Sequence, residues 1–194
     1  MQAAKDSFYM ALRERLRALN PARTVAIDGI TVPAILAREN VEPRFGEAQT
    51  EVFYVDWGEV KSAESSRPML AMDCRIWYAS EGSGGTGVDR GRALAEMDAE
   101  LLRICDPQHT EMLDYSQTPA ADLGTGLFWT EPELGSVPDD TPVAKQQRSA
   151  ATARLARYAQ LKVYFFLPEV GARRARDCGR YHDRRALISR RWIA

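Results

Sequence analysis

The amino-acid sequence predicts one α+β domain, a mostly antiparallel β-sheet packed by two α-helices, with a long proline-rich loop and a basic C-terminal tail. Two segments space their apolar side chains as amphipathic helices do, and several others alternate apolar and polar residues as half-buried strands do. The helices do not alternate regularly with strands, as they would over a parallel sheet. We assign residues 1–169 to the domain and 170–194 to the basic extension.

The composition indicates a globular chain of ordinary type. Its 194 residues, 45% hydrophobic and 27% charged, are enough for one domain with a real core. A formal net charge of −1 gives no general reason to expect nucleic acid or membrane as a partner. No apolar run approaches the roughly 18 residues of a membrane span, and the charged N-terminus lacks the apolar core of a secretory signal. We therefore expect the chain to stay in the cytoplasm where it is made.

The residues that carry chemistry in enzymes form no recognisable set. Cys74, Cys105 and Cys178 are odd in number and make no CxxC pair, so neither a disulfide framework nor a zinc site is expected. The first two lie in apolar periodic segments and are expected in the core. The only histidines, His109 and His182, have no metal-ligand or catalytic-triad spacing. We expect no catalytic residue, no metal and no cofactor, and hence not an enzyme.

The first element is a helix over residues 7–19. Asp6 or Ser7 can cap its start, and Asn20-Pro21 ends it. Its apolar stripe consists of Phe8, Leu12, Leu16 and Leu19.

A hairpin is expected next. Thr24–Ile27 and Ile30–Leu36 flank Asp28-Gly29, a pair that tolerates the positive φ angles of a tight turn. Pro33 cannot donate to a ladder, which favours an edge position for the second strand.

Two strands and a second helix follow. The strands cover Glu51–Trp57 and residues 69–78, and the helix covers Asp89–Cys105 before Asp106-Pro107 ends it. On the second strand one face is formed by Leu70, Met72, Cys74, Ile76 and Tyr78. The buried stripe of the helix consists of Leu94, Met97, Leu101 and Ile104.

The last third of the chain contains its clearest strand. Residues 108–126 are weakly patterned, Leu127–Thr130 is a short strand, and 131–149 is a proline-rich surface loop. Ala156–Leu167 then alternates strictly. One of its faces carries Ala159, Leu161, Val163, Phe165 and Leu167. The other carries Tyr158, Tyr164 and Phe166, which indicates that a helix or another subunit covers it too.

Gly82, Gly84 and Gly87 satisfy the G-x-G-x-x-G pattern of dinucleotide-binding loops, between a predicted strand and a predicted helix. The preceding strand carries Asp73 and Arg75, whereas the first strand of that fold is buried on both faces. No βαβαβ unit follows. A flexible connection accounts for the same glycines, and a nucleotide-binding enzyme that uses the 82–87 loop is the alternative.

Charge is distributed unevenly along the chain. From Gly171 to Ala194 there are eight arginines against two aspartates, a balance of +6, so the remainder is acidic at −7. This tail can neutralise nucleic-acid phosphates, bind the acidic face of a neighbouring subunit or partner, or be a disordered extension. A nucleic-acid-associated protein is thus a further alternative, although Tyr181 and Trp192 are too few for base stacking.

Five aromatic residues are candidates for contacts between subunits. Trp57, Trp77 and Trp129 lie at predicted strand ends or opposite the best-defined apolar stripe, and Tyr164 and Phe166 lie on the second face of the long strand. Aromatic side chains are enriched at protein–protein contacts. Core packing is the alternative for the tryptophans.

The order of the elements resembles the tail terminator proteins of long-tailed bacteriophages, also called tail completion or minor tail proteins. An N-terminal helix (KDSFYMALRERLRAL) precedes a strand pair (TVAIDGITVPAIL). A strand then leads through a glycine-containing loop into a second helix (RIWYASEGSGGTGVDRGRALAEMDAELLRIC), and a long strand (ARYAQLKVYFFL) closes the domain. The likeness covers residues 5–167, while the 131–149 loop and the basic tail depart from it.

The resemblance implies a structural protein of a phage or prophage. Six subunits would form a ring on the finished tail tube, stop its polymerisation and offer a surface to the head–tail connector protein. Its partners would be itself, the tail tube protein and the connector, in the host cytoplasm during assembly and then in the virion tail. Such a ring needs a heterologous interface that closes by rotation.

Overall fold

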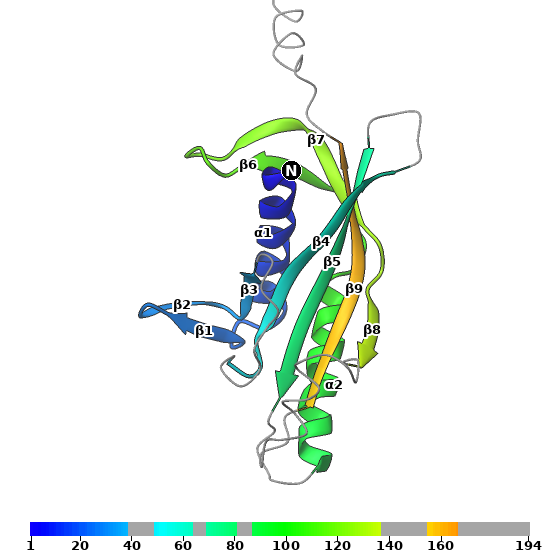
Figure 1. The fold of residues 1–194 in the computed structure, drawn as a ribbon. Coiled ribbons are helices and arrows are strands. Elements are labelled where there is room, and N and C mark those ends of the chain that lie inside the picture. The colour runs from blue at the N-terminus through cyan, green and yellow to red at the C-terminus, as the bar shows by residue number, and fades with distance from the viewer. Residues whose placement is uncertain (39–48, 64–68, 81–86, 137–154, 167–194) are drawn as a thin grey trace, which may run out of the picture.

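The computed structural model describes residues 1–38, 49–63, 69–80, 87–136 and 155–166, and Figure 1 shows how they are arranged. The elements in this part of the chain are α1 (Gln2–Leu19), β1 (Thr24–Ile27), β2 (Ile30–Pro33), β3 (Ile35–Arg38), β4 (Phe53–Ser62), β5 (Met69–Ser80), α2 (Gly87–Ile104), β6 (Thr110–Asp114), β7 (Ala121–Trp129), β8 (Glu133–Ser136) and β9 (Leu155–Phe166).

Most strands form one sheet, in the order β3-β4-β5-β9-β7-β6, with β8 also paired to β9. All of its pairs are antiparallel except β3–β4, which is parallel. The predicted α+β class with a mostly antiparallel sheet and two helices is confirmed. The glycine loop and the basic tail, like most of the proline-rich loop, lie outside the described residues. The prediction that residues 131–149 form a loop throughout is wrong at its start, because residues 133–136 form strand β8.

Helix α1 begins five residues earlier than predicted. It starts at Gln2, so Ser7 lies inside the helix and the predicted cap at Asp6 or Ser7 is wrong. Its end at Leu19, before Asn20, agrees with the prediction. Phe8, Leu12 and Leu16 are fully buried. Leu19 is exposed and does not continue the stripe.

Two residues of α1 attach it to the two edges of the sheet. The Ser7 hydroxyl accepts the backbone N–H of Leu113 in β6 at 2.9 Å and donates to the Leu113 carbonyl at 3.3 Å. The Tyr9 hydroxyl donates to the carbonyl of Ile35 in β3 at 2.9 Å. Successive helical residues are about 100° apart, so Ser7 and Tyr9 project to nearly opposite sides with Phe8 between them. The sheet therefore bends round the helix, which lies between β3 and β6 in Figure 1.

Phe8 occupies the centre of this arrangement. Its ring lies 5.5 Å from that of Trp57 in β4 and 5.0 Å from that of Trp129 in β7, both in edge-to-face geometry. Such pairs add about 0.5–1.5 kcal/mol each beyond the area that they bury. One aromatic side chain thus joins strands from both halves of the sheet.

The second helix covers the same face of the sheet, and its predicted stripe is confirmed. Leu94, Met97, Leu101 and Ile104 are all buried in the main core. Its C-terminus is capped from α1, because the Arg15 guanidinium donates to the carbonyls of Ile104 at 2.8 Å and Asp106 at 2.9 Å. A cation at a helix C-terminus satisfies carbonyls that have no partner within the helix.

The two long central strands have the faces that the sequence predicted. The buried residues directed to the helices are Met72, Cys74, Ile76 and Tyr78 of β5 and Ala159, Leu161, Val163 and Phe165 of β9. Cys74 and Cys105 are free and buried, as expected. Burial raises the pKa of Cys74 well above its ordinary value and that of Cys105 to about 12, so both stay protonated thiols.

Two strand predictions need correction. The weakly patterned stretch 108–126 contains β6 and most of β7, where only a short strand at 127–130 was expected. The segment Ile30–Leu36 is not one strand. It divides after Pro33 into β2, which pairs with β1, and β3, which joins the main sheet. The Asp28-Gly29 turn is confirmed, with φ angles of 50° and 80°.

Replacing Phe165 with alanine tests the assigned inner face of β9. Phe165 is fully buried, so we expect Phe165→Ala to lower the free energy of unfolding by about 3–5 kcal/mol through lost burial and a residual cavity. Phe128→Ala is the matched control, because Phe128 is 37% exposed and should cost much less. Urea denaturation measures both, and equal losses would show that the wrong face is assigned to the core.

Replacing Ser7 with alanine tests the attachment of α1 to the β6 edge. Ser7 is 3% exposed, and Ser7→Ala leaves a backbone N–H without its acceptor. The expected loss is about 1–3 kcal/mol. Ser62→Ala, at an exposed serine of β4, should stay within about 0.5 kcal/mol of the native chain in the same denaturation experiment. A Ser7→Ala protein as stable as this control would contradict the assignment.

Candidate interaction surface

The sheet face opposite the two helices, here called the outer face, is covered at one end by the β1–β2 hairpin. A second core cluster forms there from Val25, Ala34, Val52, Tyr54, Trp77 and Ala79. Tyr158 packs against it, with its ring 5.3 Å from that of Trp77. Val25 and Val32 of the hairpin thus belong to the same apolar cluster as Trp77 and Tyr158 of the sheet.

The apolar face of the hairpin continues past this cluster. Val25 pairs with Val32 across the two strands, and Ile27 pairs with Ile30 next to the turn. Side chains two apart on a strand share a face, so these four residues form one stripe. Val25 is buried, whereas Ile27 is 39% and Ile30 66% exposed. Ile27 ends β1 and Ile30 begins β2, and we call them the hairpin tip. The hairpin extends away from the main sheet (Figure 1).

The other end of the outer face carries an aromatic patch, which we define as Phe128, Tyr164 and Phe166. The rings of Phe128 and Tyr164 stack at 5.0 Å with 10° between their planes. Phe128 is 37% exposed, and Tyr164 and Phe166 are half-buried. Stacked aromatic rings at the surface are typical of protein–protein contacts.

A hollow of about 400 Å³ lies beside this patch. Its lining consists of Lys61, Ser62, Ala63, Met69, Ala71, Asp73, Lys162 and Tyr164. The Lys61 ammonium pairs with Glu59 at 2.8 Å, and Asp73 lies directly opposite Lys162 across β5 and β9. The hollow is therefore lined by both apolar and charged side chains, and each of its two lysines lies beside a carboxylate.

The structure divides the five candidate contact residues into two groups. Trp57, Trp77 and Trp129 are only 6%, 4% and 2% exposed, so core packing accounts for them and their side chains are not at the surface. Tyr164 and Phe166 lie on the outer face. The sequence analysis did not identify Phe128 or the hairpin tip as surface contacts. The tip could have been found from the predicted Asp28-Gly29 turn, because that turn pairs Ile27 with Ile30.

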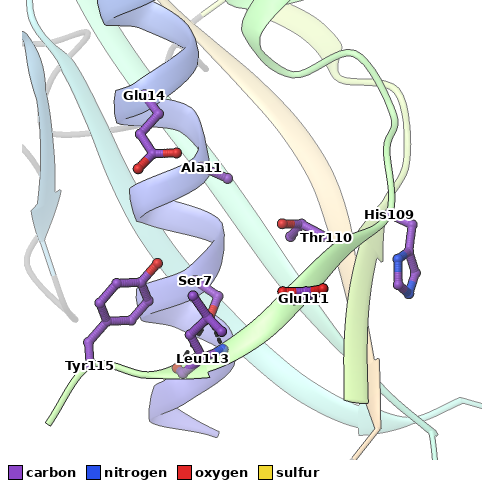
Figure 2. A pocket seen from close by; sticks show the side chains of 8 residues that line it. All are labelled: Ser7, Ala11, Glu14, His109, Thr110, Glu111, Leu113 and Tyr115. Carbon is purple, nitrogen blue, oxygen red and sulfur yellow. Dashed lines mark hydrogen bonds between the residues drawn. The ribbon is translucent and has the colours of Figure 1, made fainter. Parts of the chain in front are cut away.

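A polar pocket of about 410 Å³ lies between α1 and β6, and Figure 2 shows its lining. The Ser7 hydroxyl is engaged by Leu113, and the His109 ring is directed away from Ser7. His109 lies against Gly126 of β7, where an added Cβ would overlap the imidazole. Glu14 and Glu111 complete the acidic lining. This geometry is not that of a serine nucleophile with its base.

A buried carboxylate joins α2 to the central strands. Asp98 is 8% exposed, accepts the Tyr78 hydroxyl at 2.6 Å and pairs with the Arg157 guanidinium. Burial raises the pKa of Tyr78 far above its ordinary value, and the hydrogen bond to Asp98 acts in the same direction. Tyr78 thus stays neutral and donates its hydroxyl hydrogen to the Asp98 carboxylate, and the positive charge of Arg157 balances that carboxylate.

The sheet around the glycine loop is not that of a dinucleotide-binding fold. Strand β5, which precedes the loop, is antiparallel to both of its neighbours, β4 and β9. The dinucleotide fold places that strand in a parallel sheet. The glycine loop therefore joins a strand to a helix, as in the dinucleotide fold, but its strand does not belong to the parallel sheet of that fold.

Within the described ranges, no group of three or more His, Cys, Asp or Glu residues could hold a metal ion. No helix in the part of the chain that the structure describes is long and apolar enough to cross a membrane. No protein-family model matches the chain, and no curated protein sequence matches it.

Replacing Tyr78 with phenylalanine tests the Asp98 network. At pH 8 Tyr78→Phe should lower the free energy of unfolding by about 1.5–3 kcal/mol, because a hydrogen bond to a charged group is lost. Tyr78 keeps its proton in the folded chain above pH 10, where an unfolded tyrosine loses it, so its contribution to stability falls as the pH rises.

The native chain should therefore lose up to about 1.4 kcal/mol per pH unit more than Tyr78→Phe above pH 10. Urea denaturation between pH 8 and 11.5 measures both curves, which should converge. Curves that stay parallel across this range would contradict the assignment.

Proposed function

We propose that this chain is an assembly subunit of a phage or prophage tail, a tail terminator that forms a ring on the tail tube. The ring would end polymerisation of the tube and offer a surface to the head–tail connector protein. The observation that supports this most is the outer face. Both helices lie on the other face of the sheet, and the hairpin covers one end of the outer face. Among the described residues no element covers the Phe128–Tyr164 stack, which a partner subunit would cover in the ring.

The fold is suited to a structural role, in which a subunit binds its neighbours through surfaces of fixed shape. The chain contains, in order, the helix, strand pair, strand, second helix and long closing strand by which its sequence resembles tail terminators, with β6, β7 and β8 inserted between α2 and β9. Two of its buried polar residues serve the fold itself: Ser7 holds an edge strand, and Asp98 pairs with Arg157 and Tyr78. A ring subunit needs rigid surfaces rather than an activated nucleophile. It would act in the host cytoplasm during assembly and then remain in the virion tail.

Electron microscopy of tails made with and without the chain tests this function. In the strain that produces the tails, deleting the chain should give tubes of irregular length, mostly unjoined to heads. Supplying the native chain should restore uniform, joined particles, and supplying the core variant Phe165→Ala should not where that variant fails to fold. Tails of uniform length that are still joined to heads after the deletion would rule the function out.

A further inference from the structure

One stretch of the chain carries negative charge only. Between Arg103 and Lys145 the sequence has eight Asp and Glu residues and no Lys or Arg. Strands β6 and β7 come from this stretch, so the sheet edge that they form has carboxylates and no cation of its own. The opposite charge is concentrated in the basic tail, residues 171–194, which has a balance of +6.

The polar pocket between α1 and β6 lies at this edge (Figure 2). Glu14 of α1 and Glu111 of β6 line it, and its lining includes no Lys or Arg. Neither glutamate forms an ion pair with a described residue. Burial raises the pKa of Tyr115 in the same pocket, and the carboxylates of Glu14 and Asp6 raise it further. The pocket thus offers two carboxylates that no described cation matches, beside a tyrosine ring that is 37% exposed.

The described part of the chain ends close to this pocket. Phe165 of β9 lies opposite Leu127 of β7, which in turn lies opposite Thr110 of β6. Adjacent strands are about 4.8 Å apart, so β9 ends about 10 Å from β6. The first arginine of the tail, Arg173, is seven residues beyond Phe166, and seven extended residues reach at most about 25 Å. The tail is therefore long enough to reach the pocket of its own chain.

We propose that the basic tail, residues 171–194, binds in the pocket between α1 and β6 of the same chain. Its guanidinium groups pair with Glu14 and Glu111 and lie against the ring of Tyr115. Each exposed pair contributes little in water. A segment joined to its site by a few residues is, however, held there at high local concentration, which favours the chain's own pocket over that of a second copy. This contact is independent of the proposed function, since it needs neither a ring nor a tail tube.

Paramagnetic broadening in the full chain tests the contact. Cys178 belongs to the tail, and Cys74 and Cys105 are buried, so a nitroxide thiol reagent should label Cys178. The label should broaden the amide signals of residues 109–115 and leave those of Thr24–Ile27 unchanged. The same sample after reduction of the nitroxide is the reference. Sodium chloride at about 1 M, where the Debye length is about 3 Å, should restore the signals.

Two substitutions with the same change in net charge separate the pocket from the overall charge of the domain. Glu111→Lys should abolish the broadening, because it places a cation in the pocket. Glu96→Lys, at an exposed position of α2, is the matched control and should broaden like the native chain. Both positions are exposed, so neither substitution should change the melting temperature.

A mixture of two chains separates the chain's own pocket from that of a second copy. One chain is isotopically labelled and carries Cys178→Ser, and the other carries the nitroxide without the isotope. This mixture should show no broadening at residues 109–115. Broadening in the mixture, no broadening in the labelled native chain, or a Glu111→Lys chain broadened as strongly as Glu96→Lys would each overturn the contact.

Discussion

The fold depends on one turn of α1, where Ser7, Phe8 and Tyr9 hold the helix to both edges of the sheet and to its centre. A strongly bent sheet has two distant edges, and each presents backbone groups that need partners. Ser7 engages the β6 edge, Tyr9 engages the β3 edge, and Phe8 packs between Trp57 and Trp129. Because all three side chains come from one helical turn, neither edge can move without disturbing the other's contacts.

This arrangement assigns the two faces of the sheet different tasks. The concave face encloses α1, and α2 is joined to it by Arg15, which caps α2 from α1. Both helices pack on this concave face, so no described helix covers the outer face. That face is covered at one end by a two-stranded hairpin, which is marginal by itself and is held to the sheet through the second core cluster. The other end keeps its aromatic stack at the surface.

Sequence periodicity predicted the elements that a single buried face determines. The stripes of α2, β5 and β9 were correct because burial on one side imposes spacing on apolar residues. Periodicity gave wrong predictions where a polar side chain forms a long-range hydrogen bond. Ser7 was expected to cap α1, yet it lies inside the helix and engages a strand over a hundred residues away. Strands β6 and β7 were not predicted, because Gly124, Gly126 and the acidic residues around them interrupt the alternation of apolar and polar side chains. The tryptophans were ambiguous because an aromatic at a strand end packs equally well inward or outward.

The second core cluster also limits which residue can stand at position 135 of β8. Gly135 lies directly opposite Tyr158 of β9, and a Cβ added at this glycine would lie 2.7 Å from Cζ of the tyrosine ring. Any larger residue there would therefore displace the ring of Tyr158, which lies 5.3 Å from that of Trp77 and packs against the second core cluster. The covered end of the outer face thus depends on a glycine in a strand that sequence periodicity did not predict, as well as on the apolar residues of the hairpin.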